Sequence, residues 1–239
     1  MSNYLLDGYH GETAAQAPES ERVAFIRRTY LHLAVSVAAL VGLEFILFKS
    51  GVAGDILQAW FSSKFSLLIV FALFIGGGLL AQMMARAAMP AFVKYLALAG
   101  YTCLQAVFLL PILYVAMVRT GGGLDMINQA AVMTLVTFGG LTLTVFLTKM
   151  DFSFLRAGLV AVSWAAFAVI IGGIIFGFGL GIWFSFLMVA LAAGYILYDT
   201  SNILHHYRTD EHVGAALELL ADVVLMFYYI LRILLSRGD

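Results

Sequence analysis

Long apolar runs, separated by short polar or glycine-rich breaks, make up most of this chain. A helix that crosses a bilayer needs roughly 20 mostly apolar residues, and seven runs of about that length are present. The predicted spans are residues 30–48, 65–85, 92–118, 127–148, 154–176, 182–204 and 213–235. The pattern predicts an all-α, polytopic integral membrane protein with about seven transmembrane helices.

The composition strengthens this prediction and excludes several other classes of protein. Of the 239 residues 63% are hydrophobic and only 11% are charged, whereas soluble domains carry about 25% charged residues. The net charge of −1 gives no reason to expect nucleic acid as a partner, so the expected partner is the lipid bilayer. Cys103 is the only cysteine, which excludes an internal disulfide and a cysteine-based metal site.

The first residues of the chain differ from all that follows. Residues 1–21 are polar and acidic, whereas a secretory signal begins basic and turns apolar at once. We expect residues 1–21 to form a polar, disordered or loosely held tail, and residues 22–239 to form a single seven-helix transmembrane domain.

Lysine and arginine in short loops predict the orientation, because cytoplasmic loops carry an excess of them. With a cytoplasmic N-terminus, eight of the 13 basic residues fall on the cytoplasmic side and five on the far side. The cytoplasmic set is Arg22, Arg27, Arg28, Arg86, Lys94, Lys149, Arg156 and Arg208. The bias favours a cytoplasmic N-terminus, and seven spans then place the C-terminus outside.

Four acids fall inside the predicted spans, where a charge is costly: Glu44, Asp199, Glu218 and Asp222. Asp199 and Asp222 lie on consecutive spans, and their midpoint is the centre of the connecting loop. If the loop takes about eight residues, each acid lies roughly 12 Å inside its helix at a rise of about 1.5 Å per residue. The spacing therefore predicts two carboxyls at one depth on neighbouring helices.

Two carboxyls in one site of low dielectric cannot both ionise cheaply, so this pair is expected to share a proton and to respond to pH. Hard cations such as Ca²⁺ prefer oxygen ligands, so Asp199 and Asp222 are also candidate calcium ligands. The alternative is that each acid separately faces water or caps a helix end.

The other two acids have a simpler interpretation. Glu218 precedes Asp222 by four residues and shares its helix face, so it is a candidate for the ion path; because it is close to the helix start, a solvated position at the interface is favoured. Glu44 is near the outer end of its span, where snorkelling to the interface is favoured over a place on a hydrated path. His205, His206 and His212 fit no standard zinc spacing and are expected in a solvated loop.

Three segments carry a resemblance to a known family. They are Gly194-Tyr-Ile-Leu-Tyr-Asp199-Thr-Ser-Asn-Ile203, Ala216-Leu-Glu-Leu-Leu-Ala-Asp222 with Phe227 and Leu231-Arg232 after it, and Arg28-Thr-Tyr30. Together they resemble the Bax inhibitor-1 (TMBIM) family, in its bacterial form. One departure is that Val-Val-Leu follows Asp222, where members of that family commonly carry a polar residue.

The resemblance implies a seven-helix protein of a bacterial inner (plasma) membrane. It implies that Asp199 and Asp222 act as a pH-sensing latch on a calcium leak, with Arg86 as the arginine that could match a partner in the second helix. It also leaves open a membrane regulator or adaptor, for example of a membrane-anchored quality-control protease, for which the N-terminal tail would be suited.

Enzymatic activity is not expected. No nucleophile–base pair, phosphate-binding glycine loop or metal-ligand cluster is present, and Leu-Leu-Ala before Asp222 departs from the GxGD motif of intramembrane aspartyl proteases. We therefore expect no organic cofactor, with Ca²⁺ only as a transported ion. Glycines within the spans indicate tight helix packing, and the spacing of Gly173 and Gly177 leaves a dimer face as the alternative; a monomer or weak oligomer is expected.

Overall fold

The computed structural model of the chain describes residues 13–86 and 89–236, except for the side chain of residue 86. The helices are α1 (Glu19–Lys49), α2 (Val52–Trp60), α3 (Lys64–Arg86), α4 (Ala91–Arg119), α5 (Asp125–Thr148), α6 (Arg156–Phe176), α7 (Ile182–His205) and α8 (His212–Ser236), with a 3-10 turn η2 (Ser153–Leu155) before α6. No named strand occurs in the described part of the chain.

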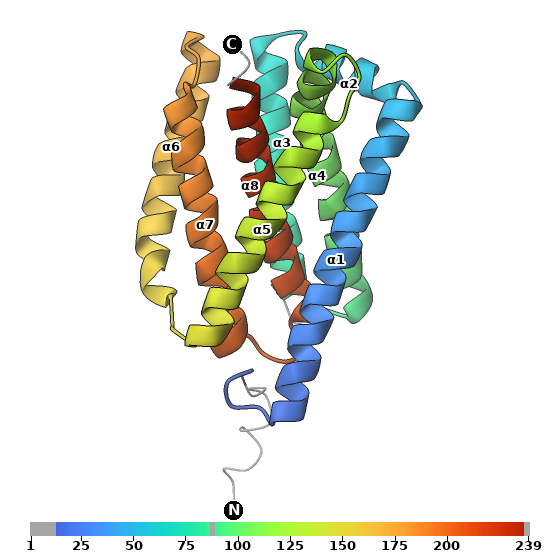
Figure 1. Cartoon of the computed structure of the whole chain (residues 1–239). Coiled ribbons are helices and arrows are strands. Elements are labelled where there is room, and N and C mark those ends of the chain that lie inside the picture. The colour runs from blue at the N-terminus through green and yellow to red at the C-terminus, as the bar shows by residue number, and fades with distance from the viewer. Residues whose placement is uncertain (1–12, 87–88, 237–239) are drawn as a thin grey trace, which may run out of the picture.

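Seven of these helices, all except α2, are long and apolar enough to cross a membrane. Figure 1 shows them side by side in one bundle, with the start of α1 at one end and the end of α8 at the other. We call these the N-terminal end and the C-terminal end of the bundle. The predicted all-α membrane fold is confirmed.

Helix α8 occupies the centre of the bundle (Figure 1) and packs against α7, α1, α5, α4 and α3. Its side chains are buried on all sides, among them Leu217, Leu219, Leu220 and Leu231, which are fully buried. The surrounding helices instead expose large apolar side chains, as expected for surfaces that face lipid. Residues on α8 are therefore in a position to contact most of the other spans.

The predicted spans agree closely with the helices except at two places. Helix α1 begins at Glu19, well before the predicted start at residue 30, because its first turns are polar and extend beyond the apolar run. The prediction also missed α2, whose nine residues are too short to span a bilayer. Ala53 and Leu57 of α2 pack with Leu110 of α4.

The predicted tail differs from the structure over residues 13–21. Thr13 pairs with Arg208 in an isolated antiparallel bridge, and the Ala14 N–H donates to the Tyr207 carbonyl over 2.7 Å. Residues from Glu19 onward already belong to α1. The segment before α1 is thus held against the loop between α7 and α8, while residues 1–12 lie outside the described residues.

Gly173 and Gly177 serve a turn at the end of α6. Gly177 has φ +78°, in the left-handed region that favours glycine, and it caps the helix through a bond from its N–H to the Gly173 carbonyl. A Cβ on Gly173 would meet the Phe178 carbonyl oxygen at 3.3 Å. The spacing is explained by this turn and needs no dimer face.

Candidate functional site

Asp199 on α7 and Asp222 on α8 lie together inside the bundle. Their exposed fractions are 7% and 5%, and a side-chain hydrogen bond joins the two carboxyls. A hydrogen bond between two carboxyls requires a proton on one of them. The pairing predicted from the sequence is therefore present in the structure, and its role in sensing pH stays a prediction.

The sequence predicted that Asp199 and Asp222 lie at equal distances from the loop between their helices. In the structure the two distances differ. Asp199 is six residues before His205, where α7 ends, and Asp222 is ten residues after His212, where α8 begins. At about 1.5 Å per residue these separations are roughly 9 and 15 Å. Since the carboxyls still meet, α8 begins further from the level of the pair than α7 ends.

A cavity of about 500 Å³ contains the pair. Its polar lining comes from five helices: Gln82 of α3, Tyr101 and Gln105 of α4, Arg156 of α6, Tyr195, Tyr198 and Asp199 of α7, and Glu218 and Asp222 of α8. Two buried acceptors in this lining, Asp222 Oδ2 and Gln105 Oε1, have no hydrogen-bond partner among the described residues. The cavity thus offers oxygen atoms to whatever enters it.

A second cavity of about 470 Å³ continues toward the loop between α7 and α8. It shares Arg156 and Tyr198 with the first cavity and is also lined by Asn202, His206 and Glu211. The two cavities are neighbours, since Arg156 and Tyr198 line both, and the Arg156 side chain between them is exposed.

Glu218 is buried, with an exposed fraction of 6%. The favoured prediction of a solvated interfacial acid is wrong, because the Tyr207 hydroxyl from the loop covers this carboxyl and donates a hydrogen bond to it. Tyr207 also accepts the bond from Ala14 described above. One loop residue therefore connects the segment before α1 with the aspartate cavity.

The loop between α5 and α6 is fastened to the end of α7 beside the pair. The Phe152 N–H donates to Ser201 Oγ over 2.9 Å, and Asp151 lies 3.7 Å from His206 in an exposed ion pair. Hydrogen bonds from the Ser153 hydroxyl and backbone N–H hold the pKa of Asp151 below its usual range, with a smaller contribution from His206. At the N-terminal end of the bundle, polar contacts thus join the loop between α5 and α6 to the end of α7.

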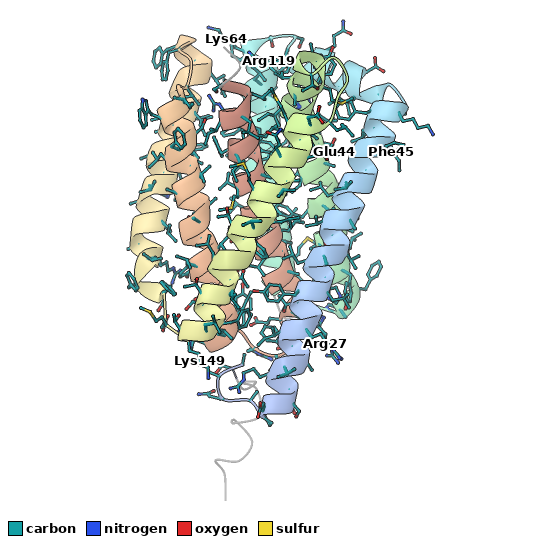
Figure 2. All side chains as sticks on the ribbon, in the orientation of Figure 1. Arg27, Glu44, Phe45, Lys64, Arg119 and Lys149 are labelled. Carbon is teal, nitrogen blue, oxygen red and sulfur yellow. The ribbon has the colours of Figure 1, made fainter. Side chains whose placement is uncertain are left out.

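Several predicted site residues do not join the pair. The side chain of Arg86 lies outside the described residues, so the suggested partnership is not addressed. Glu44 lies on α1 toward the C-terminal end (Figure 2), and its exposed fraction of 8% makes the snorkelling prediction wrong. His206 is exposed in the loop, whereas His205 ends α7 and His212 begins α8 and both are half-buried, so a fully solvated histidine loop is not what the structure has.

Gln82, Gln105 and Tyr207 were not predicted as site residues, and Arg156 was counted only among the basic residues of the cytoplasmic side. A single amide inside an apolar run is weak evidence for a functional site, because such groups are common in membrane helices. Gln105 could still have been found, since it lies in the middle of a long apolar span and a buried amide there needs a partner.

Comparison with known proteins shows the family to which the chain belongs. The family model described as "Inhibitor of apoptosis-promoting Bax1" matches residues 22–239. The chain is 30% identical to mouse protein lifeguard 4, covering 95% of this chain and 91% of that protein. It is 30% identical to an uncharacterized protein of Campylobacter jejuni, covering 99% and 98%, and 29% identical to Bax inhibitor 1 of Schizosaccharomyces pombe, covering 97% and 84%.

Proposed function

Because this chain belongs to the Bax inhibitor-1 family, we propose that it is a pH-sensitive calcium leak in which Asp199 and Asp222 form the latch. The observation that carries the proposal is the hydrogen bond between these two buried carboxyls inside a polar cavity. Each aspartate belongs to a different helix, so a change in their interaction acts on the packing of α7 against α8.

The latch depends on one proton. With the proton present, the two carboxyls attract each other through their hydrogen bond. When it leaves, two like charges face each other; at 4 Å and an effective dielectric of about 20, such charges interact by about 4 kcal/mol. Repulsion of that size separates the helices or recruits a cation, so acid favours the latched state and alkaline conditions favour the open one.

The cavity suits a passing hard cation. Ca²⁺ takes six to eight oxygen ligands, and the carboxylates together with the unpartnered Gln105 oxygen and the Gln82 amide supply only part of that shell. Water would complete it. An incomplete protein shell favours transit over tight retention, so Ca²⁺ is treated as cargo, and neither a resident cofactor nor catalytic turnover is proposed.

Arg156 is the described basic residue that lines the aspartate cavity. Its guanidinium opposes cations at the mouth and attracts the carboxylates once they are ionised. We assign to Arg156 the role of a charge barrier that weakens when the pair loses its proton. The resemblance implied Arg86, by contrast, as a partner of the pair.

The proposed location is a bacterial inner membrane, with the N-terminal end of the bundle facing the cytoplasm. The excess of basic residues at that end supports this orientation, and Figure 2 marks Arg27 and Lys149 there. Reporter fusions at both termini test it. Reporters on the same side of the membrane would contradict an odd number of crossings.

Purified protein in liposomes that enclose a calcium dye tests the leak directly. Flux should rise with pH by up to about tenfold per unit, the limit set by release of one proton. Asp199→Asn and Asp222→Asn each remove the second charge, so each should flatten the profile, and the double variant should add little because the pair acts as a unit. Wild-type pH profiles in both single variants would contradict the latch.

The alternative is a membrane regulator or adaptor without transport, and the docked segment at residues 13–17 supports it. This segment holds the chain before α1 at the face of the loop between α7 and α8. Deleting residues 1–12 leaves those contacts in place: an adaptor should then lose its partner, whereas a leak should keep its flux. If the full chain shows no flux at any pH, the leak is wrong and the adaptor stands.

A further inference from the structure

A separate cavity of about 320 Å³ lies between α1, α4, α5 and α8. Its lining is mostly aliphatic: Val37, Leu40, Val41, Leu109, Leu113, Ile127, Ala131, Leu135, Val223 and Val224, with Phe227 and the polar Glu44, Asn128 and Thr134. An apolar cavity of this kind stays free of water unless polar groups hold it there.

The cavity is on the side of the bundle that faces lipid between α1 and α5. Each of these helices packs against α8, and they contact each other through rings outside the cavity lining, where Tyr30 of α1 lies against Phe138 and Phe146 of α5. Val41 and Leu135 line the cavity from the two helices, yet 65% and 61% of their side chains are exposed. Acyl chains of a bilayer would cover these residues, so a molecule dissolved in the hydrocarbon can reach the cavity.

Glu44 is the unusual member of this lining. It is 92% buried by the exposed fraction given above, and neither carboxyl oxygen has a hydrogen-bond partner among the described residues. Thr134 does not donate to it, because the Thr134 hydroxyl donates to the Ala130 carbonyl. An isolated carboxylate is very costly in such surroundings, so Glu44 holds a proton and offers an unused donor and acceptor.

We infer that this cavity binds a single-chain amphipathic amine drawn from the bilayer, with the alkyl chain on the aliphatic walls and the amine nitrogen on the Glu44 carboxyl. An amine is the base that complements an unpartnered acid. It enters as the neutral free base, and the Glu44 proton moves from oxygen to nitrogen, so the pair forms a charge-assisted hydrogen bond without bringing net charge into the membrane.

The size of the cavity limits the ligand. At about 30 Å³ for a water-sized group, the space takes on the order of ten methylene groups. That suits one alkyl chain of medium length and excludes the two chains of a phospholipid. Since lipid is as apolar as the walls, the chain alone gives little preference for the cavity, and the acid supplies the selectivity.

Carbodiimide labelling gives a readout at Glu44 itself. Dicyclohexylcarbodiimide dissolves in the hydrocarbon and adds to a protonated carboxyl. The resulting O-acylisourea can rearrange to a stable N-acylurea, and no group leaves in either step. In phosphatidylcholine nanodiscs, mass spectrometry should find this adduct on the peptide that contains Glu44. N,N-Dimethyldodecylamine, a tertiary amine that cannot form an amide with the activated carboxyl, should reduce the adduct at least tenfold, whereas dodecanol at the same concentration should reduce it less than twofold.

Variants distinguish the contribution of the Glu44 carboxyl to amine binding from the contribution of the cavity volume. Glu44→Gln keeps the shape and should weaken dodecylamine binding, measured by native mass spectrometry, at least tenfold. Leu135→Trp fills the entrance and should weaken it too, whereas Leu143→Trp, an exposed leucine of α5 outside the cavity, should not. Circular dichroism checks that each variant is folded.

Each of the following results would overturn the inference: equal amine binding by the parent and Glu44→Gln, equal protection by dodecanol and N,N-dimethyldodecylamine, or no effect of Leu135→Trp. Nanodiscs that contain phosphatidylethanolamine distinguish the source of the amine, because protection by that lipid alone would contradict a single-chain ligand. None of these measurements depends on calcium flux, so this inference and the proposed leak can fail separately.

Discussion

Two sets of carboxyls lie within the membrane-spanning part of this protein, and their surroundings are opposite. Asp222 meets the carboxyl of Asp199 in a cavity that also holds amide and phenol groups. Glu44 lies among aliphatic side chains and has no hydrogen-bond partner in the described part of the chain. Their exposed fractions, 5% and 8%, are nearly equal, so burial alone does not distinguish them.

The difference lies in what each carboxyl can do with its proton. Asp222 can share its proton with the Asp199 carboxyl through their hydrogen bond, and the same cavity supplies neutral oxygens and Arg156 to interact with a carboxylate. The lining of the Glu44 cavity contains no second carboxyl and no arginine, so the proton of Glu44 stays until a base arrives from outside. The two cavities lie against the same helix, since Val224 of α8 lines both, yet they support different chemistry.

The largest expected effect is a pair of leucine substitutions that change stability in opposite directions. Asp222→Leu removes the hydrogen bond of Asp199 and should lower the free energy of unfolding by about 1–3 kcal/mol. Glu44→Leu removes an unsatisfied polar group from an aliphatic site and should raise the free energy by a similar amount. Thermal unfolding in detergent, followed by circular dichroism, measures both.

Glu44→Gln is the matched control for that pair, because it keeps a polar group in place and should change stability little. If Glu44→Leu and Asp222→Leu both destabilise the protein, Glu44 has a partner and the contrast between the two sites is lost.

A smaller effect is expected at the covering of Glu218. Tyr207→Phe removes the hydroxyl that donates to this buried carboxyl and should cost about 1 kcal/mol of unfolding free energy, in the range of hydrogen bonds within membrane proteins. Tyr95→Phe is the control, because the Tyr95 hydroxyl makes only a 3.4 Å contact with His212. Equal unfolding midpoints for the two variants would show that Glu218 does not depend on Tyr207.

The smallest effect is expected at Asp151, an acid outside the spans. Its pKa is lowered mainly by the hydrogen bonds of Ser153, so Ser153→Ala should raise it toward the usual value near 4. A lowered pKa contributes stability above the unfolded pKa, and this contribution is lost as pH falls through the folded one. Titration of the Asp151 carboxyl by NMR measures the shift, and an unchanged value would exclude the assigned cause.

An exposed carboxyl gains little from such bonds, so the stability of Ser153→Ala should stay close to that of the parent even at neutral pH. Three kinds of acid can thus be compared. Local hydrogen bonds determine the protonation of the exposed acid, the two charges of the pair determine that of the buried aspartates, and a ligand determines that of the buried single acid.

The number of spans and, apart from the start of α1, their limits follow from the sequence alone, because a bilayer imposes one simple requirement on length and apolarity. The predicted 182–204 and 213–235 lie within one residue of α7 and α8 at each end. The pairing of Asp199 with Asp222 could also be predicted, since two helices joined by a short loop must pack side by side. The short α2 gave no such signal, because it does not cross the membrane.

Which helix is central could only be decided by the tertiary structure. The best apolar windows of α3 and α8 have mean hydropathies of 2.2 and 2.0, yet 6% of the first is buried inside the protein and 61% of the second. Hydropathy cannot separate them, because lipid and protein interior are equally apolar environments. For the same reason the sequence placed Glu44 and Glu218 at interfaces: whether an acid near a helix end meets water, a tyrosine or an empty cavity depends on the helices packed around it.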